Sequence, residues 1–138
     1  MSLLDEETVN DFELARKVIT EKNLSYVVIS CGKIWKESQN NSISSLIGII
    51  DGMGKDLTNM IIGTSYLDRA SSLLCRYAKA SGVYSPSGTK TAIAILIMGG
   101  VPCQIDRLDR NNVETSFDKI VNGVENPVDA YNILKEKI

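Results

Sequence analysis

The sequence predicts an α/β protein, a three-layer α/β/α sandwich around a mixed five-stranded sheet. Cys31-Gly32 separates two strand-like segments and is typical of a hairpin, which makes those strands antiparallel neighbours. Beyond this hairpin, strand-like and helix-like segments alternate, a pattern typical of parallel strands joined by helices. The segment Met60–Ser81 contains one such strand, a turn and a helix, and we expect the rest of the chain to pack around it.

The first predicted elements are a helix and the hairpin. Apolar residues recur at helical spacing within Thr8–Lys22, and Asn23 is a suitable residue to end this helix. Strands are predicted over 24–30 and 33–38, and the second suits an exposed edge because it carries lysines. A short amphipathic helix over 43–53 follows a polar loop.

The central strand and helix are predicted from an apolar run and a capping pattern. Residues 60–62 are all apolar, as in a strand that is covered on both faces. Ser65 and Asp68 have the spacing of a capping box, which would start the helix at this turn. Gly82 is the predicted residue that ends the helix.

The next segment is predicted to form a strand, a turn and an apolar helix. The strand covers 82–85 and the turn covers 86–88. The helix ends at Met98, with Ser87 or Thr89 as its cap. Because it is apolar on nearly all sides, we expect it to be buried or to lie in a subunit interface, and we expect a homodimer or a higher homo-oligomer.

The last strand and two further helices complete the predicted order. The strand covers 101–108, and Pro102 favours an edge position because proline cannot donate to a neighbouring strand. A short helix is predicted over 115–122. Asn126 and Pro127 are typical of the first residues of a helix, which continues to about Lys137.

Composition predicts one soluble domain over residues 1–138, with 1–7 as a flexible leader. The formal net charge is −2 and no run of Lys or Arg occurs, so we expect no nucleic-acid partner. The N-terminus is acidic, unlike a signal peptide, and no apolar stretch approaches the roughly 20 residues that span a bilayer. We therefore expect a cytoplasmic protein that does not interact with membranes.

The cysteines and the absence of histidine restrict the chemistry. The chain has three cysteines, Cys31, Cys75 and Cys103, which are far apart in the sequence and resemble free thiols. The sequence contains no histidine, which excludes Ser-His-Asp and Cys-His catalytic sites as well as zinc sites that need histidine. We expect no metal and no cofactor.

Four stretches of the chain form an ordered set of motifs. They are DFELARKVI at Asp11–Ile19, the Gly32-Lys33 hairpin, Leu67-Asp68-Arg69-Ala70 running into Ser72–Cys75, and Val121–Leu134 with its Glu125-Asn126-Pro127 and Ala130-Tyr131. Together these stretches cover most of the chain and resemble a small uncharacterised prokaryotic family with the cytidine-deaminase-like fold. The resemblance implies the deaminase-like fold for this chain.

The zinc-binding motifs of deaminases are missing from the corresponding places. Deaminases carry H-x-E at the helix after the third strand and P-C-x-x-C at the next helix. The resemblance places Asp68-Arg69-Ala70 and Pro86-Ser87-Gly88 there, and Pro102-Cys103 is followed by no second cysteine. The family also has a C-P-x-E-like element, which Thr115-Ser116-Phe117-Asp118 replaces here while keeping one carboxylate. The resemblance therefore implies a protein that has lost zinc-dependent deamination.

The favoured function is non-catalytic binding or regulation with a small polar, nucleotide-like ligand. Helix N-termini and the carboxyl ends of parallel strands are common places for such ligands. The candidate binding residues are Gly63, Thr64, Ser65, Asp68 and Arg69, with Lys33 and Arg110 as anion contacts.

Two alternatives remain open from the sequence. One is an enzyme of a non-zinc type, with Asp68 and Arg69 as an acid–base pair or Cys75 as a nucleophile. The other is a structural or partner-binding module that uses the apolar helix over 92–98 or an exposed strand edge.

Overall fold

The computed structural model describes residues 6–110 and 115–137, which form five strands and six helices. The elements in chain order are α1 (Glu6–Lys22), β1 (Tyr26–Ser30), β2 (Lys33–Ser38), α2 (Ile43–Gly52), β3 (Ile61–Thr64), α3 (Arg69–Tyr77), β4 (Gly82–Thr89), α4 (Lys90–Met98), β5 (Cys103–Asp109), α5 (Ser116–Ile120) and α6 (Pro127–Lys137).

The five strands form one mixed sheet in the order β2-β1-β3-β4-β5. β1 is antiparallel to both β2 and β3, whereas β3, β4 and β5 are parallel to one another. The predicted α/β class and mixed five-stranded sheet are therefore confirmed. The order also places β2 and β5 at the two edges, as their sequences predicted.

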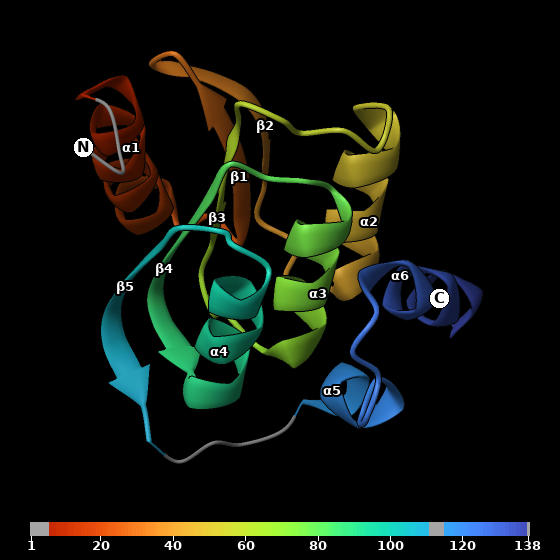
Figure 1. Ribbon diagram of the computed structural model, residues 1–138. Coiled ribbons are helices and arrows are strands. Elements are labelled where there is room, and N and C mark those ends of the chain that lie inside the picture. Colours follow the sequence, from red (N-terminus) through yellow and green to blue (C-terminus); the bar gives the residue numbers. More distant parts are fainter. Residues whose placement is uncertain (1–5, 111–114, 138) are drawn as a thin grey trace.

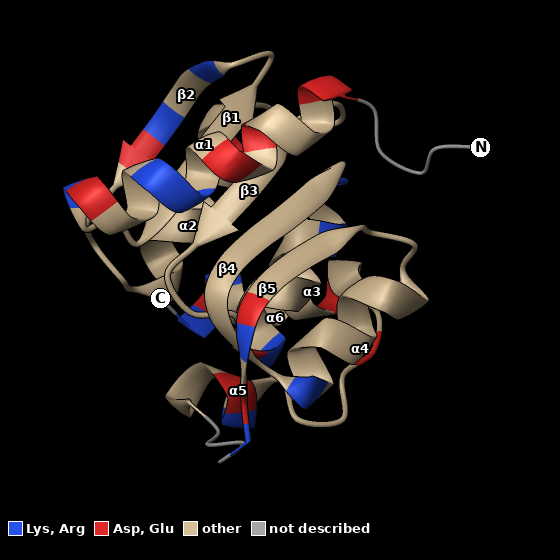
Figure 2. Ribbon diagram, turned by 90° about the vertical axis from the view of Figure 1, so that its left-hand side faces the viewer, with Lys and Arg blue, Asp and Glu red and all other residues tan. Residues whose placement is uncertain are grey.

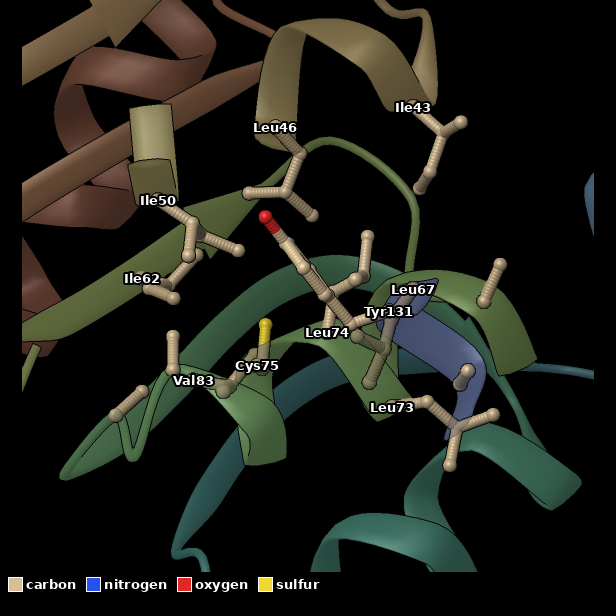
Figure 3. Close-up of a cluster of buried hydrophobic side chains, with 14 of the residues drawn as sticks. Ile43, Leu46, Ile50, Ile62, Leu67, Leu73, Leu74, Cys75, Val83 and Tyr131 are labelled. Carbon is tan, nitrogen blue, oxygen red and sulfur yellow. The ribbon is translucent and has the colours of Figure 1, made fainter. Parts of the chain in front are cut away.

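Helices cover both faces of the sheet (Figure 1). α1 lies on one face, where Phe12, Ala15 and Ile19 pack against apolar residues of the sheet such as Val27 and Tyr84. α2, α3 and α4 lie on the other face, and α6 packs against α3 from outside. This second face carries the larger core (Figure 3), whose labelled members are Ile43, Leu46, Ile50, Ile62, Leu67, Leu73, Leu74, Cys75, Val83 and Tyr131.

The hairpin between β1 and β2 has the predicted two-residue connection. Cys31 and Gly32 both have positive φ, at 51° and 73°, as a type I′ turn requires. Asp11 of α1 stabilises the turn, because its carboxylate accepts hydrogen bonds from the amides of Cys31 at 3.0 Å and Gly32 at 2.8 Å. The turn is thereby attached to the helix that covers this face.

The start of α3 differs from the prediction by three residues. Its N-cap is Asp68 rather than Ser65, and Asp68 forms a capping box with Ser71. The Asp68 carboxylate accepts from the Ser71 amide at 2.8 Å, while the Ser71 hydroxyl accepts from the Asp68 amide at 3.0 Å. Ser65 cannot begin a helix because its amide donates to the Ser25 carbonyl at 3.0 Å, which keeps it extended beside the sheet.

The end of α3 also differs from the prediction. Gly82 is the first residue of β4, and the helix ends at Tyr77. Lys79 adopts a φ of 61° and donates its amide to the Arg76 carbonyl, while Ala80 donates to the Cys75 carbonyl at 3.2 Å. This pair of bonds is a Schellman motif, in which glycine is the usual residue at the position of Lys79.

Replacing Lys79 with glycine is expected to raise the free energy of unfolding by about 0.5–1 kcal/mol, because glycine adopts positive φ without a steric penalty. Urea denaturation of wild type and Lys79→Gly would measure the change. Lys90→Gly is a matched control, since Lys90 lies in the first turn of α4 and glycine should destabilise that helix. A loss of stability in Lys79→Gly would contradict the expectation.

β4 is longer than predicted, and the predicted turn over 86–88 is wrong. β4 continues through Pro86 to Thr89. β3 pairs with β4 only as far as Tyr84. β5, on the other side of β4, pairs with Ser85 and Ser87 on either side of the proline, and this pairing continues to Thr89. Proline is tolerated here because the strand no longer has β3 as a neighbour on its other side.

The apolar segment before Met98 is a helix, as predicted. Thr89 caps α4 by accepting from the Ala92 amide at 3.1 Å, and Gly100 has a φ of 71° just beyond its end. The helix is only partly buried, because Ile97 is 64% and Met98 77% exposed.

α6 begins as predicted, with the Asn126 side chain accepting from the Val128 amide at 2.8 Å. Within residues 6–110 and 115–137, no helix is long and apolar enough to cross a membrane.

Candidate functional site

An open groove of about 590 Å³ lies beyond the carboxyl ends of the three parallel strands. Ser65 and Tyr66 follow β3 directly, Ser87 lies near the end of β4, and the end of β5 contributes its last residues. We call this the β3–β5 groove. Its lining residues are Ser65, Tyr66, Ser87, Arg107, Leu108, Asp109 and Arg110.

Charged side chains are concentrated on the β5 side of the groove. Figure 2 shows acidic and basic residues following one another along β5 and just beyond it. Arg107 and Arg110 are both exposed, and neither guanidinium forms an ion pair or hydrogen bond with the residues at 6–110 or 115–137. The groove therefore presents two cationic groups to solvent.

Tyr66 and Asp109 connect the β3 and β5 sides of the groove. The Tyr66 hydroxyl donates to the Asp109 carboxylate at 2.7 Å. Burial raises the pKa of Tyr66, and the hydrogen bond to Asp109 and its charge raise it further, so the phenol is protonated at neutral pH. The tyrosine side chain is thereby held across the opening between the two strands.

The backbone around the groove is fixed by the sheet. The Leu67 amide donates to the Ser87 carbonyl at 2.9 Å, and the Thr89 amide donates to the Leu67 carbonyl at 3.0 Å. These bonds extend the sheet beyond the end of β3. The backbone that follows β3 is therefore held against β4 by hydrogen bonds at the edge of the groove.

Of the seven predicted site residues, the structure brings Ser65 and Arg110 together in this groove. Thr64 is buried, and its hydroxyl donates to the Tyr66 carbonyl at 3.1 Å. Gly63 lies under α1, where it permits close packing. Lys33 lies at the opposite end of the sheet, since it pairs with Ser30 whereas Thr64 pairs with Tyr26 at the other end of β1.

Asp68 and Arg69 lie beside the groove but contact other parts of the chain. The Arg69 guanidinium donates to the carbonyls of Val121 at 3.1 Å and Val124 at 2.7 Å, just after α5. The Thr115 hydroxyl donates to the Asp68 carboxylate at 3.1 Å. We call the contacts of Asp68, Arg69, Thr115 and Asp118 the α3–α5 interlock.

Asp118 completes this interlock from α5. Its side chain is buried and accepts from the Ala70 amide at 2.9 Å, in the first turn of α3. Burial raises the pKa of Asp118, and the nearby Asp68 charge raises it further, while bonds from backbone amides oppose the shift. A carboxylate of the chain itself thus occupies the anion-binding position at this helix N-terminus.

Sequence reasoning placed the site at the start of α3 and missed most of the groove. Tyr66, Ser87, Arg107 and Asp109 were not among the predicted residues. A signal was available for Arg107 and Asp109, because polar residues at the carboxyl end of a parallel strand are common ligand contacts. For Ser87 no such signal existed, since its segment was predicted to be a turn.

The cysteines lie in three separate places. Cys31 is exposed in the hairpin turn, Cys75 is buried in α3, and Cys103 is half-buried in β5. In the part of the chain that the structure describes, no three His, Cys, Asp or Glu side chains are grouped closely enough to hold a metal ion. Burial raises the pKa of the Cys75 thiol to about 12, and Asp68 contributes a smaller increase.

Cys31 is expected to react with iodoacetamide in the folded protein, whereas Cys75 should stay unmodified until the protein unfolds. A thiol with a strongly raised pKa carries almost no thiolate at neutral pH, and Cys75 has no exposed surface. Peptide mass spectrometry after timed alkylation, with and without urea, would measure both rates. Rapid alkylation of Cys75 in the folded protein would contradict this expectation and support a role for Cys75 as a nucleophile.

Comparison with solved structures identifies a similar fold. A crystal structure of a DUF1893 family protein from Thermotoga maritima superposes with a TM-score of 0.83. The match covers 98% of this chain and 92% of the other. This chain shares the fold of that DUF1893 protein. The sequences are only 16% identical, so the similarity to the DUF1893 protein establishes the fold alone. No protein-family model matches the chain, and no curated protein is significantly similar in sequence.

Proposed function

We propose that this protein is a non-catalytic binding protein for a small polar ligand of nucleotide type, which binds in the β3–β5 groove. The observation that carries the proposal is the position of this groove beyond the carboxyl ends of three parallel strands. Ligands of open α/β sheets bind preferentially at this edge. The volume of about 590 Å³ also falls within the range of small-molecule sites, about 300–1,000 Å³.

We further infer that the fold is of the cytidine-deaminase-like type without the zinc site. The order of strands and the helices after β3 and β4 support this inference, together with the sequence resemblance. In that fold, zinc ligands would come from the starts of α3 and α4. Here Asp68 and Arg69 are used in the α3–α5 interlock, which supports a loss of zinc-dependent deamination.

The groove supports binding better than the alternative of a non-zinc enzyme. Asp68 accepts hydrogen bonds from Ser71 and Thr115, and Arg69 donates to two carbonyls, so an acid–base pair would have to break these contacts. Cys75 is fully buried. Neither group is arranged to meet a substrate.

A partner-binding role has one observation in its favour. The outer side of α4 exposes Ile97 and Met98 at its C-terminal end, although single exposed apolar residues are common on protein surfaces. Homo-oligomerisation through α4 therefore remains a second proposal. Light scattering that finds a monomer at high micromolar concentration would contradict it.

Native mass spectrometry of freshly purified protein, compared with the denatured mass, would test for a co-purified small molecule. Thermal-shift measurements with bases, nucleosides and nucleotides would follow, because a ligand of the folded state raises stability by about 2.7 kcal/mol at 100 times its Kd. Ser65→Gln should reduce this stabilisation by filling the groove. Ser44→Gln, on the exposed side of α2, is the control. No stabilisation at millimolar concentration would contradict the proposal.

A further inference from the structure

We infer that the ligand of the β3–β5 groove is an organic phosphate monoester, whose phosphate is bound by Arg107 and Arg110. This inference rests on the proposed function and specifies its ligand class. It starts from the two guanidinium groups, which lie three residues apart at the end of β5 and both line the groove.

The charge balance of the groove favours an anion. Its ionisable side chains comprise the two arginines and Asp109 together with the protonated phenol of Tyr66. Asp109 accepts the hydrogen bond from Tyr66, whereas the guanidinium groups have no ion-pair partner among the residues described. Among the described lining residues, the net formal charge is therefore +1, obtained from two arginines and one aspartate.

The type of cation favours phosphate over a single carboxylate. Guanidinium groups are planar, remain charged at all physiological pH values, and form paired hydrogen bonds with phosphate oxygens. A phosphate monoester carries a charge of about −1.5 to −2 at pH 7 and three acceptor oxygens. It can therefore satisfy Arg107 and Arg110 together, which a monovalent carboxylate with two oxygens does less well.

The rest of the groove favours an organic body attached to that phosphate. Tyr66 and Leu108 offer an aromatic ring and an apolar side chain, and Leu108 is 42% exposed. Ser65, Ser87 and Asp109 add polar groups that suit hydroxyl or amino donors. Because the groove is about 590 Å³, it has room for a sugar phosphate or a nucleoside monophosphate as well as for the phosphate itself.

The test compares ligands that differ only in the phosphate. Isothermal titration in a phosphate-free, low-salt buffer would measure the Kd of nucleoside 5′-monophosphates, the matching nucleosides, ribose 5-phosphate and inorganic phosphate. At least one phosphate monoester should bind about tenfold or more tightly than its phosphate-free counterpart, as charge-assisted bonds predict. Its affinity should fall as salt screens the exposed arginines.

Variants would locate the phosphate. Arg107→Gln and Arg110→Gln should each weaken binding of the monoester by about tenfold while leaving the nucleoside affinity unchanged. Lys36→Gln, which removes a cation from β2 at the opposite edge of the sheet, is the matched control and should have no effect. Circular dichroism and denaturation midpoints would verify that the variants fold.

The outcomes separate this inference from the proposed function. Tighter binding of the nucleotide than of ribose 5-phosphate would support a nucleotide, and equal binding would support a sugar phosphate. A nucleoside that binds as tightly as its monophosphate would overturn the phosphate inference while leaving ligand binding intact. If inorganic phosphate binds as tightly as any ester, the inference that the ligand carries an organic group would be wrong. Absence of any binding would overturn both proposals.

Discussion

Replacing Gly63 with valine is expected to lower the free energy of unfolding by about 2–3 kcal/mol. A Cβ atom at Gly63 would lie 2.7 Å from Cγ1 of Val27 and 2.8 Å from Cδ1 of Ile19. The first of these atoms belongs to the neighbouring strand β1 and the second to α1. Since Val27 is β-branched and has little rotational freedom, the added side chain would push α1 away from the sheet.

Urea denaturation would measure this loss, with the denaturation midpoint as the primary result. Gly48→Ala is a matched control, because a Cβ at Gly48 meets nothing within 4 Å on the exposed side of α2. That substitution should raise stability by about 0.5–1 kcal/mol, the usual benefit of alanine over glycine in a helix. If Gly63→Val unfolded at the same urea concentration as wild type, the inferred close packing of α1 against β3 would be contradicted.

Replacing Asp118 with alanine is expected to lower the free energy of unfolding by about 2–3 kcal/mol. The change removes the acceptor of the Ala70 amide, which then stays buried without a partner at the start of α3. It also loosens α5, which the interlock attaches to α3. Asp118→Asn keeps one acceptor oxygen at nearly the same volume and should lose less stability than Asp118→Ala. Equal losses in both variants would show that the hydrogen bond is not the important contact.

The two variants also allow a pH test of the buried carboxylate. The folded-state pKa of Asp118 is raised above its ordinary value of about 4 by burial and by Asp68. Its contribution to stability is therefore fully present below about pH 4 and is lost as the pH rises through the raised pKa. As the pH falls from 7.5 to 4.5, the stability of wild type should therefore increase relative to that of Asp118→Asn. A difference that does not change with pH would contradict the buried, charged state.

Local sequence signals predicted most elements of this fold but not their limits. The hairpin at Cys31-Gly32, the cap of α4 at Thr89 and the start of α6 at Asn126 depend on nearby residues, so they were readable from the sequence. The predicted β4 was too short because proline usually ends a strand, and a turn was predicted to start at Pro86. Proline fits there only because β3 has already ended at Thr64, and a neighbouring strand that stops is a tertiary fact.

The site was less predictable than the fold for a similar reason. Asp68 and Arg69 are residue types that often bind ligands. Their sequence neighbours do not reveal that both side chains form hydrogen bonds with residues about 50 positions later in the chain. Conversely, Arg107 was predicted only as part of an edge strand over 101–108, although its position near the carboxyl end of that strand was a usable signal. Its place in the groove depends on the side-by-side arrangement of β3, β4 and β5, which sequence patterns do not determine.

The position of α1 has a consequence for folding during synthesis. This helix is synthesised before β3 and β4, against which it packs and which follow it by about 40 to 80 residues. β1 covers part of its apolar stripe early, but the stripe, which includes Phe12, is not fully covered until the chain has been made at least as far as Tyr84. At a typical rate of about 5–20 residues per second, that interval lasts several seconds. A nascent chain of this protein would accordingly be a candidate for chaperone binding through its first helix.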